Sequence, residues 1–436
     1  MPAACEITHP QITAGTCPWC GHLVGASDRA PNVTERIWNV AAMAAALDDP
    51  NVDVRSMTVT NLWRKGPPAD AAVSLLSKAL TDSSSEIRHH AAHGLSRLGR
   101  DISADDVRRF EEQIPGSPHE LGLRILALGY YFLGQRESES ARAARQEHIF
   151  WLIRHAPECD TAGSPESSLY ARDDQDAYAK AKQLWLAQID SHPENTSILG
   201  NAARFFLLDD WETSETLLKR ARDLEPANPE WSERLGHLYS LQSGHRAPGA
   251  QVHARSALEE LRHAEQLRMD TAPNSPGEMS LDVAKVRSLL ERIYKLPQLA
   301  KAAFEAREVE EARNYAMELL EKAASPDLPE FFRNSGNAVH HGNLILGRIA
   351  LQSGDLAQAR EWLIAAARTS GSPQLNSFGP NMSLAKELLE RGERDAVLEY
   401  FALCAKFWKH GAETLAAWTD QVRAGEMPDF RANLRY

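Results

Sequence analysis

The spacing of small and bulky residues between positions 195 and 239 limits this stretch of the chain to paired helices. Small, bulky and turn residues alternate at Ala202, Phe205, Ser214, Leu218, Ala221, Leu224 and Pro226. Leu235, Gly236 and Tyr239 then restart the same pattern one repeat later. Small residues let two antiparallel helices approach closely, and the bulky ones fill the groove against the next pair. The pattern therefore predicts helical hairpins that bury their apolar faces against neighbouring hairpins.

This phasing resembles that of the tetratricopeptide (TPR) family. Three further pairs follow toward the C-terminus: a weak one marked by Leu299–Leu319, a strong one marked by Leu346–Ala366 and a last one marked by Leu384–Cys404. Gly354 and Gly392 fall in turns between helices, where glycine is favoured. A last helix, ETLAAWTDQVRAG, is expected to cap the array, because terminal repeats need a polar outer face. The resemblance implies a right-handed superhelix that presents a curved surface to a protein or peptide partner.

A second repeat, with a period of 33 residues, lies closer to the N-terminus. Asp49, Arg55, Leu62 and Gly66 recur as Asp82, Arg88, Leu95 and Gly99. Each copy has an acidic turn, an arginine near the start of a helix, apolar residues at helical spacing and a glycine stop. This pattern resembles HEAT repeats, and the resemblance implies that the aspartate braces the turn while the arginine ladders with the neighbouring repeat.

These observations predict an all-α chain, a right-handed α-solenoid of HEAT-like and TPR-like helix pairs with a small N-terminal zinc-ribbon-like module. We expect the zinc-binding module at residues 1–25, HEAT-like repeats at 35–135, and TPR-like repeats with a C-terminal capping helix at 141–436. A solenoid suits a chain of 436 residues, because each repeat contacts only its neighbours.

The charge balance disfavours nucleic acid as the main partner. Asp and Glu number 60 against 48 Lys and Arg, whereas a phosphate-binding track needs an excess of basic residues on one face. No window is apolar over the 18 residues that a membrane span requires. We see no secretory signal, and five cysteines, three of them near the N-terminus, fit a reducing compartment, so we expect a cytoplasmic protein.

The N-terminal cysteines predict one structural zinc ion. Cys17 and Cys20 form a C-x2-C turn that points two thiolates at one ion, and Gly21 permits the tight backbone. Cys5 and His9 complete a Cys3His set, although His22 could replace His9. A segment this short cannot bury a core, so metal binding would supply its folding energy. Four nearby ligands leave no open position for catalysis.

The TPR resemblance implies a groove lined by the first helix of each pair. Carried over by phase, the groove residues are Ala203, Phe206, Leu207, Glu233, His237, Leu241, Arg348, Leu351 and Gln352. The lysine and asparagine of the chaperone-binding subfamily are missing from the corresponding positions, which suits a more apolar, mixed groove for a helix or extended peptide. An alternative is that these residues only pack the superhelix.

We find no enzyme signature: GxxxxGK[ST], GxSxG and HExxH are all missing from the sequence. We therefore predict a non-catalytic scaffold or adaptor.

Two alternatives stay open. A metalloenzyme could use Glu86, His89 and His93, which share one face of an expected helix. A nucleic-acid-associated regulator could use the zinc module with a basic face at Arg29, Arg36, Arg55, Arg64 and Lys65. His340 and His341 are expected in a surface or capping position.

Overall fold

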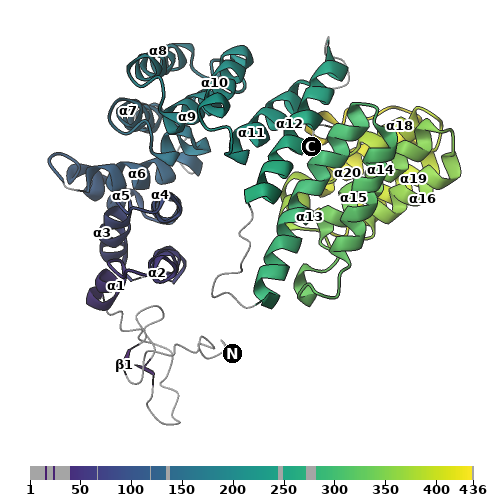
Figure 1. The fold of residues 1–436 in the computed structure, drawn as a ribbon. Coiled ribbons are helices and arrows are strands. Elements are labelled where there is room, and N and C mark those ends of the chain that lie inside the picture. Colours follow the sequence, from purple (N-terminus) through teal and green to yellow (C-terminus); the bar gives the residue numbers. More distant parts are fainter. Residues whose placement is uncertain are drawn as a thin grey trace. The chain divides into compact units, whose positions relative to one another are not determined.

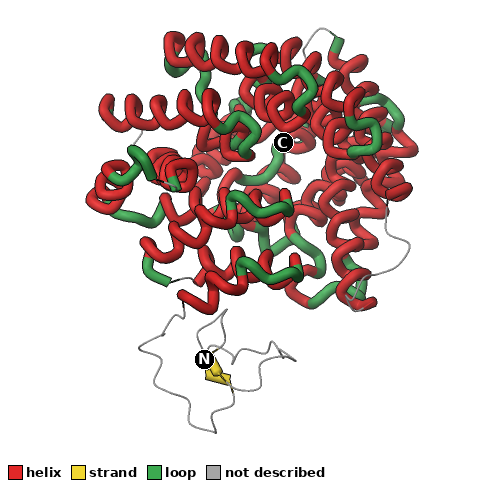
Figure 2. Tube along the Cα trace, turned by 60° about the vertical axis from the view of Figure 1, so that its left-hand side comes forward, coloured by secondary structure: helices red, strands yellow, loops and turns green. Residues whose placement is uncertain are grey.

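The computed structural model describes residues 15–16, 23–24, 40–65, 67–117, 119–133, 138–243, 249–271 and 281–434. The chain divides into two compact units, Met1–Glu225 and Pro226–Tyr436, which are treated separately below. This division by contacts differs from the expected boundary near residue 140, which followed repeat type. Helices make up almost all of the regular structure in the described ranges (Figure 2).

The first unit opens with two short antiparallel strands, β1 (Gly15–Thr16) and β2 (Leu23–Val24), with Gly15 opposite Val24. Helices follow in sequence order (Figure 1). They are α1 (Val40–Ala46), α2 (Val52–Lys65), α3 (Ala69–Ala79), α4 (Ser85–Gly99), α5 (Ala104–Glu112), α6 (Glu120–Leu133), α7 (Glu139–His155), η1 (Asp160–Gly163), η2 (Pro165–Ser167), α8 (Gln175–Ser191), α9 (Thr196–Phe206) and α10 (Trp211–Leu224).

Close backbone contact joins α4 to α6 in the N-terminal hairpins. A Cβ placed on Gly99 would lie 2.0 Å from the carbonyl oxygen of Leu126, and one on Gly129 would lie 2.0 Å from that of Ser96. Both glycines are therefore packing positions. The expectation that Gly99 only stops a helix was incomplete, because Gly99 is the last residue of α4 and also touches the next repeat. Apolar residues such as Leu62, Leu95 and Leu126 fill the core between these helices.

The expected arginine ladder is present between the first two hairpins. Arg55 Nε and Nη2 donate to Asp82 Oδ2 and Oδ1 at 2.8 and 3.1 Å, and Arg55 Nη1 donates to the carbonyl oxygen of Asp49. In the next repeat, Arg88 Nη1 donates to the carbonyl oxygen of Asp82 at 2.8 Å, which matches the contact of Arg55 with the Asp49 carbonyl oxygen. The bidentate geometry is the strong form of an arginine–carboxylate contact, and it fixes one repeat against the next. The Arg55 guanidinium, through its hydrogen bonds, holds the pKa of Asp82 below its usual value.

A folded connection between α7 and α8 is fastened to the HEAT-like hairpins. Glu166, only 8 % exposed, accepts hydrogen bonds from Ser96 Oγ at 2.9 Å and from Arg100 Nη2 at 2.6 Å. Arg145 donates to the backbone carbonyl oxygens of Glu166 and Ser168. Burial would raise the pKa of Glu166, but these hydrogen bonds outweigh burial and lower it. The carboxylate is therefore held ionised within the unit.

The second unit is a further series of helices, coloured from teal through green to yellow in Figure 1. They are α11 (Pro229–Gln242), α12 (Ala250–Thr271), α13 (Leu281–Glu305), α14 (Val309–Ala323), η3 (Glu330–Phe332), α15 (Gly336–Gln352), α16 (Leu356–Ala367), α17 (Pro373–Phe378), α18 (Ser383–Leu389), α19 (Arg394–Cys404), η4 (Lys409–Gly411), α20 (Ala412–Ala424) and η5 (Arg431–Leu434).

The small residues singled out by the repeat pattern do lie where helices approach closely. A Cβ on Gly236 would lie 2.7 Å from Leu261 Cγ, which shows how tightly α11 and α12 pack. In the turn between α15 and α16, Gly354 has φ of +85°, a conformation that glycine adopts at little cost. Asp355 then caps α16 by accepting a hydrogen bond from the Gln358 amide.

The helix α13 is continuous from Leu281 to Glu305, with Pro297 inside it. The expected capping helix is present as α20, and the chain beyond it also covers the core. Phe430 is 1 % exposed and packs edge-on against Trp418, and Asn433 Nδ2 donates to the carbonyl oxygens of Phe378 and Pro380.

Candidate functional site

The expected zinc ligands fall outside the described residues. None of the five candidate ligands is a described residue: Cys5, His9, Cys17, Cys20 and His22. The zinc module therefore stays a prediction.

The alternative metal site on α4 is not assembled in this structure. His89 Nδ1 lies 2.8 Å from Asp160 Oδ2, so its ring is engaged with η1. His93 contacts the Trp63 ring edge-on, and burial lowers its pKa. Glu86 is exposed. Within the stretches of chain that the structure covers, no three His, Cys, Asp or Glu side chains come together as a metal site.

The basic face proposed for nucleic acid is also only partly described. Arg29 and Arg36 lie outside the described residues. Arg55 is bound to Asp82, so its charge is neutralised within the protein. Arg64 is exposed and lies over the Trp63 ring, 5.1 Å from its centroid. The structure gives no account of the Lys65 side chain.

The predicted groove is closed at its first helix, α9. Ala203 and Phe206 are 1 % and 0 % exposed, so neither side chain is available to a partner. The Phe206 ring packs edge-on against Phe205, and the Lys182 ammonium lies 5.7 Å from its centroid. Leu207 is half-buried. The phase of the repeat placed these residues on the correct helix, but neighbouring side chains cover that face.

At α11 the predicted groove residues divide by exposure. Glu233 forms ion pairs with Arg268 of α12 and Lys295 of α13. His237 and Leu241 are exposed. The charged position is therefore used to tie three helices of the second unit together, and the two exposed positions remain open to solvent.

At α15 the predicted groove is again mostly filled. Arg348 is 6 % exposed, donates to both oxygens of Glu387 and lies over the Phe304 ring at 4.4 Å from its centroid. Leu351 is buried, whereas Gln352 is exposed. Across the nine predicted positions, the buried ones do not form a binding surface in this structure.

His340 occupies a buried position in α15, contrary to the expected surface location. Its exposed fraction is 0 %. The Asn381 amide donates to His340 Nε2 at 2.9 Å, so the ring's Nδ1–H donates to the Ala366 carbonyl oxygen at 3.1 Å. Burial, with the adjacent His341 imidazole, lowers the pKa of His340 to about 3. The neutral ring thereby joins α15 to the end of α16 and to the loop before α18.

A second buried polar cluster was not expected from the sequence. His148 Nε2 lies 2.8 Å from Glu111 Oε1, and the Tyr131 hydroxyl donates to the same carboxylate at 3.1 Å. Arg124 Nη1 lies 3.3 Å from His148 Nδ1. Because His148 is 5 % exposed, the arrangement is closed to a substrate. It stabilises the packing of α5, α6 and α7. The cluster could not be found from the sequence, because its residues come together only when these three helices are placed in space.

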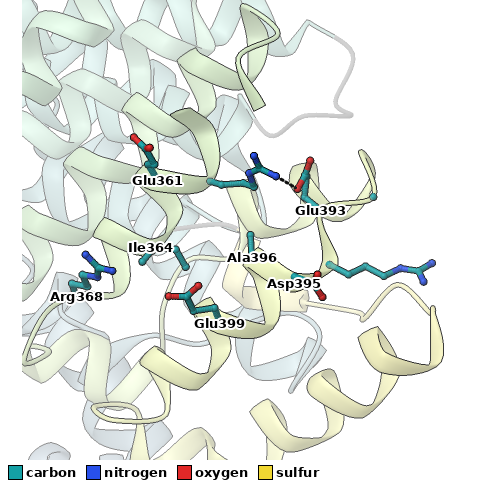
Figure 3. A pocket seen from close by; sticks show the side chains of 10 residues that line it. Glu361, Ile364, Arg368, Glu393, Asp395, Ala396 and Glu399 are labelled. Atoms are coloured by element: carbon teal, nitrogen blue, oxygen red, sulfur yellow. Dashed lines mark hydrogen bonds and ion pairs between the residues drawn. The ribbon is translucent and has the colours of Figure 1, made fainter. Parts of the chain in front are cut away.

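A large depression lies between α16 and α19 in the second unit (Figure 3). Its volume is about 850 Å³. Its walls come from α16, α19 and the adjoining residues, and they consist of Arg360, Glu361, Ile364, Arg368, Gly392, Glu393, Arg394, Asp395, Ala396 and Glu399. Since α16 and α19 are second helices of their pairs, this surface is distinct from the groove expected on the first helices.

Charged residues from opposite walls are paired at only one end of this depression. Arg360 Nη1 donates to Glu393 Oε2 at 3.0 Å and closes that end. Arg368 and Glu399 lie at the end away from Glu393 (Figure 3). Three of the lining charges are exposed and make no ion pair with another described residue: Arg368, Asp395 and Glu399. The depression therefore presents charges of both signs that the surrounding residues do not neutralise.

The helices contain no candidate membrane span: in the described residues, none is both long enough and apolar enough to cross a bilayer.

Residues 40–114 match the family described as HEAT repeats. This match covers α1 to α5 and confirms the HEAT-like prediction for that part of the chain. No curated protein matches the chain. Together with the helical hairpins of both units, the match is consistent with an α-solenoid, an architecture whose HEAT members generally serve as scaffolds for protein interaction.

Proposed function

We propose that this chain is a non-catalytic, cytoplasmic scaffold that binds a protein partner through the depression between α16 and α19. In this proposal HEAT repeats form the N-terminal part, TPR-like hairpins continue from residue 141, and a Cys3His zinc module at residues 1–25 provides a second contact or a cap. Repeat hairpins suit this role, since they offer extended surfaces whose side chains vary without loss of the fold.

The observation that carries the proposal is the unneutralised charge in the depression. Elsewhere in the second unit, Glu233 of α11 is paired with Arg268 of α12 and Lys295 of α13. Arg368 and Glu399 lack such partners among the described residues. Mixed, exposed charges around a small apolar floor are typical of the rim of a protein interface, where they set specificity and association rate.

A photo-crosslinking amino acid at Ala396 tests this proposal. Ala396 lines the depression, whereas Ala402 is exposed on the same helix outside it. In extracts of the native cell we expect one specific adduct at position 396, none at 402, and a weaker adduct when Glu399→Arg is added. Equal adducts at both positions, or an adduct unchanged by Glu399→Arg, would place the interaction elsewhere.

The zinc module has its own test. Elemental analysis of purified protein should find one zinc per chain, and a second metal equivalent would favour the metalloenzyme alternative. Replacing His9 or His22 separately distinguishes the two candidates for the fourth ligand.

A further inference from the structure

The walls of the depression carry charges in an ordered arrangement. On α16, Arg360 and Ile364 are four residues apart, and Arg368, the residue that caps the C-terminal end of this helix, follows after another four on the same side. On α19, Asp395 and Glu399 are also four residues apart, about 6 Å along the helix axis. The α16 wall also carries Glu361 and the α19 wall also carries Arg394, so both walls hold charges of both signs; the charges at four-residue spacing are basic on the α16 side and acidic on α19.

Of the four charges at this spacing, Arg360, Arg368, Asp395 and Glu399, the last three make no ion pair with a described residue. Arg360 of the α16 wall forms an ion pair with Glu393 of the opposite wall. Arg394 approaches α20 instead: its Nη2 lies 3.3 Å from the point that a Cβ on Gly425 would occupy. The side-chain Nε2 of Gln358 donates to Glu361 Oε2 at 3.0 Å. Arg368 on the α16 wall and Asp395 and Glu399 on the α19 wall are left, above a floor that includes Ile364 and Ala396.

The known modes of peptide recognition narrow the class of ligand. Strand addition requires an exposed sheet edge, and the lining here comes from helices and their adjoining turns. Polyproline recognition requires aromatic side chains, and none lines this depression. Phosphate recognition requires an arginine cluster, whereas the lining carries one more acidic than basic residue. A helix laid in the trough between two helices remains.

We infer that the depression binds an amphipathic helix of a partner protein, with two basic residues one turn apart on the flank that meets α19. An acidic residue on the opposite flank meets Arg368, and a seam of small apolar residues rests on Ile364 and Ala396. The four-residue spacing of Asp395 and Glu399 matches the i, i+4 spacing on the partner helix. This inference rests on the proposed function and adds the chemical class of the partner.

Three synthetic helical peptides with the same leucine and alanine seam test the inference. One has lysine on one flank and glutamate on the other, one has lysine on both flanks, and one has glutamate on both. Fluorescence anisotropy with the full chain at low salt should rank the mixed peptide first. We expect a preference of about three- to ten-fold, since each exposed ion pair contributes only modestly.

A charge reversal in the protein makes the prediction specific. With Arg368→Glu both walls are acidic, so the peptide with lysine on both flanks should become the tightest ligand. Lys406→Glu makes the same charge change at an exposed residue outside the depression and should leave the order unchanged. Circular dichroism of both variants should match the original protein, which excludes misfolding as the cause of a changed order.

Equal affinities for the three peptides, no measurable binding of any of them, or an order unaffected by Arg368→Glu would each overturn the inference. Its failure is distinguishable from failure of the proposed function. An adduct at Ala396 that maps to a non-helical partner segment would retain the scaffold function and remove the helix as ligand. Loss of both the peptide preference and the adduct would remove the two together.

Discussion

The buried imidazole of His340 makes the stability of the second unit depend on pH. The folded protein holds this ring neutral, with a pKa of about 3, whereas in the unfolded chain the ring has an ordinary pKa near 6.5. Between these values the unfolded state binds a proton that the folded state does not. Stability contributed by His340 is therefore complete above about pH 6.5 and is lost progressively as the pH falls toward 3.

The size of the effect follows from the two pKa values. Lowering the pH from 7 to 5 should reduce the free energy of unfolding by about 2 kcal/mol through His340 alone. Burial also lowers the pKa of His341, which adds a contribution of the same sign. The lowered pKa values of ion-paired carboxylates such as Asp82 affect a more acidic range.

Comparison with His340→Gln isolates the contribution of one ring. Glutamine does not titrate and can keep one of the two hydrogen bonds, so we expect the variant to be less stable at pH 7 by about 1–3 kcal/mol. Its stability should then fall by about 2 kcal/mol less than that of the original protein between pH 7 and pH 5. Urea unfolding at pH 7, 6 and 5, followed by circular dichroism, measures both quantities. Parallel losses of stability in the two proteins would refute the reasoning.

Three further predictions concern the first unit. Glu166→Gln should lower the free energy of unfolding by about 1–3 kcal/mol in urea titrations, because its charge-assisted hydrogen bonds are lost in a buried setting, and an unchanged midpoint would contradict the network. Gly99→Ala should destabilise by about 1–3 kcal/mol, since the new Cβ would lie 2.0 Å from the Leu126 carbonyl oxygen, and a melting temperature equal to that of the original protein would show that α4 and α6 are not in contact. Cys17→Ser should reduce the bound zinc from one ion per chain to less, as measured by elemental analysis; full retention would exclude Cys17 as a ligand.

Local sequence patterns predicted this fold well at positions where a turn or a close contact between helices requires a particular residue type. Gly354 lies in a turn at positive φ, and Gly236 lies where two helices touch. The resemblance to HEAT repeats implied a ladder contact, and the structure contains one between Arg55 and Asp82. Each of these features depends on a residue and its immediate repeat neighbour, so the sequence pattern and the repeat family it resembles were enough.

The candidate site was harder to predict, because it depends on what covers each helix face. The repeat phase assigned Phe206 and Arg348 to a groove, but phase gives the face of a helix and not the side chains packed on it. The depression between α16 and α19 is bounded by segments about thirty residues apart in sequence, and its unpaired charges become evident only when both helices are placed. His340 similarly looked exposed beside polar neighbours, although its partners come from Ala366 and Asn381.

Hydrogen–deuterium exchange tests the central claim, partner binding between α16 and α19, most directly. The amides of Leu356–Ala367 and Arg394–Cys404 would be compared in the free protein and in complex with the partner captured at Ala396. We expect slower exchange in these two helices, while Thr196–Phe206, whose predicted groove residues are buried, exchanges at an unchanged rate. Protection confined to Thr196–Phe206, with α16 and α19 unaffected, would contradict the account.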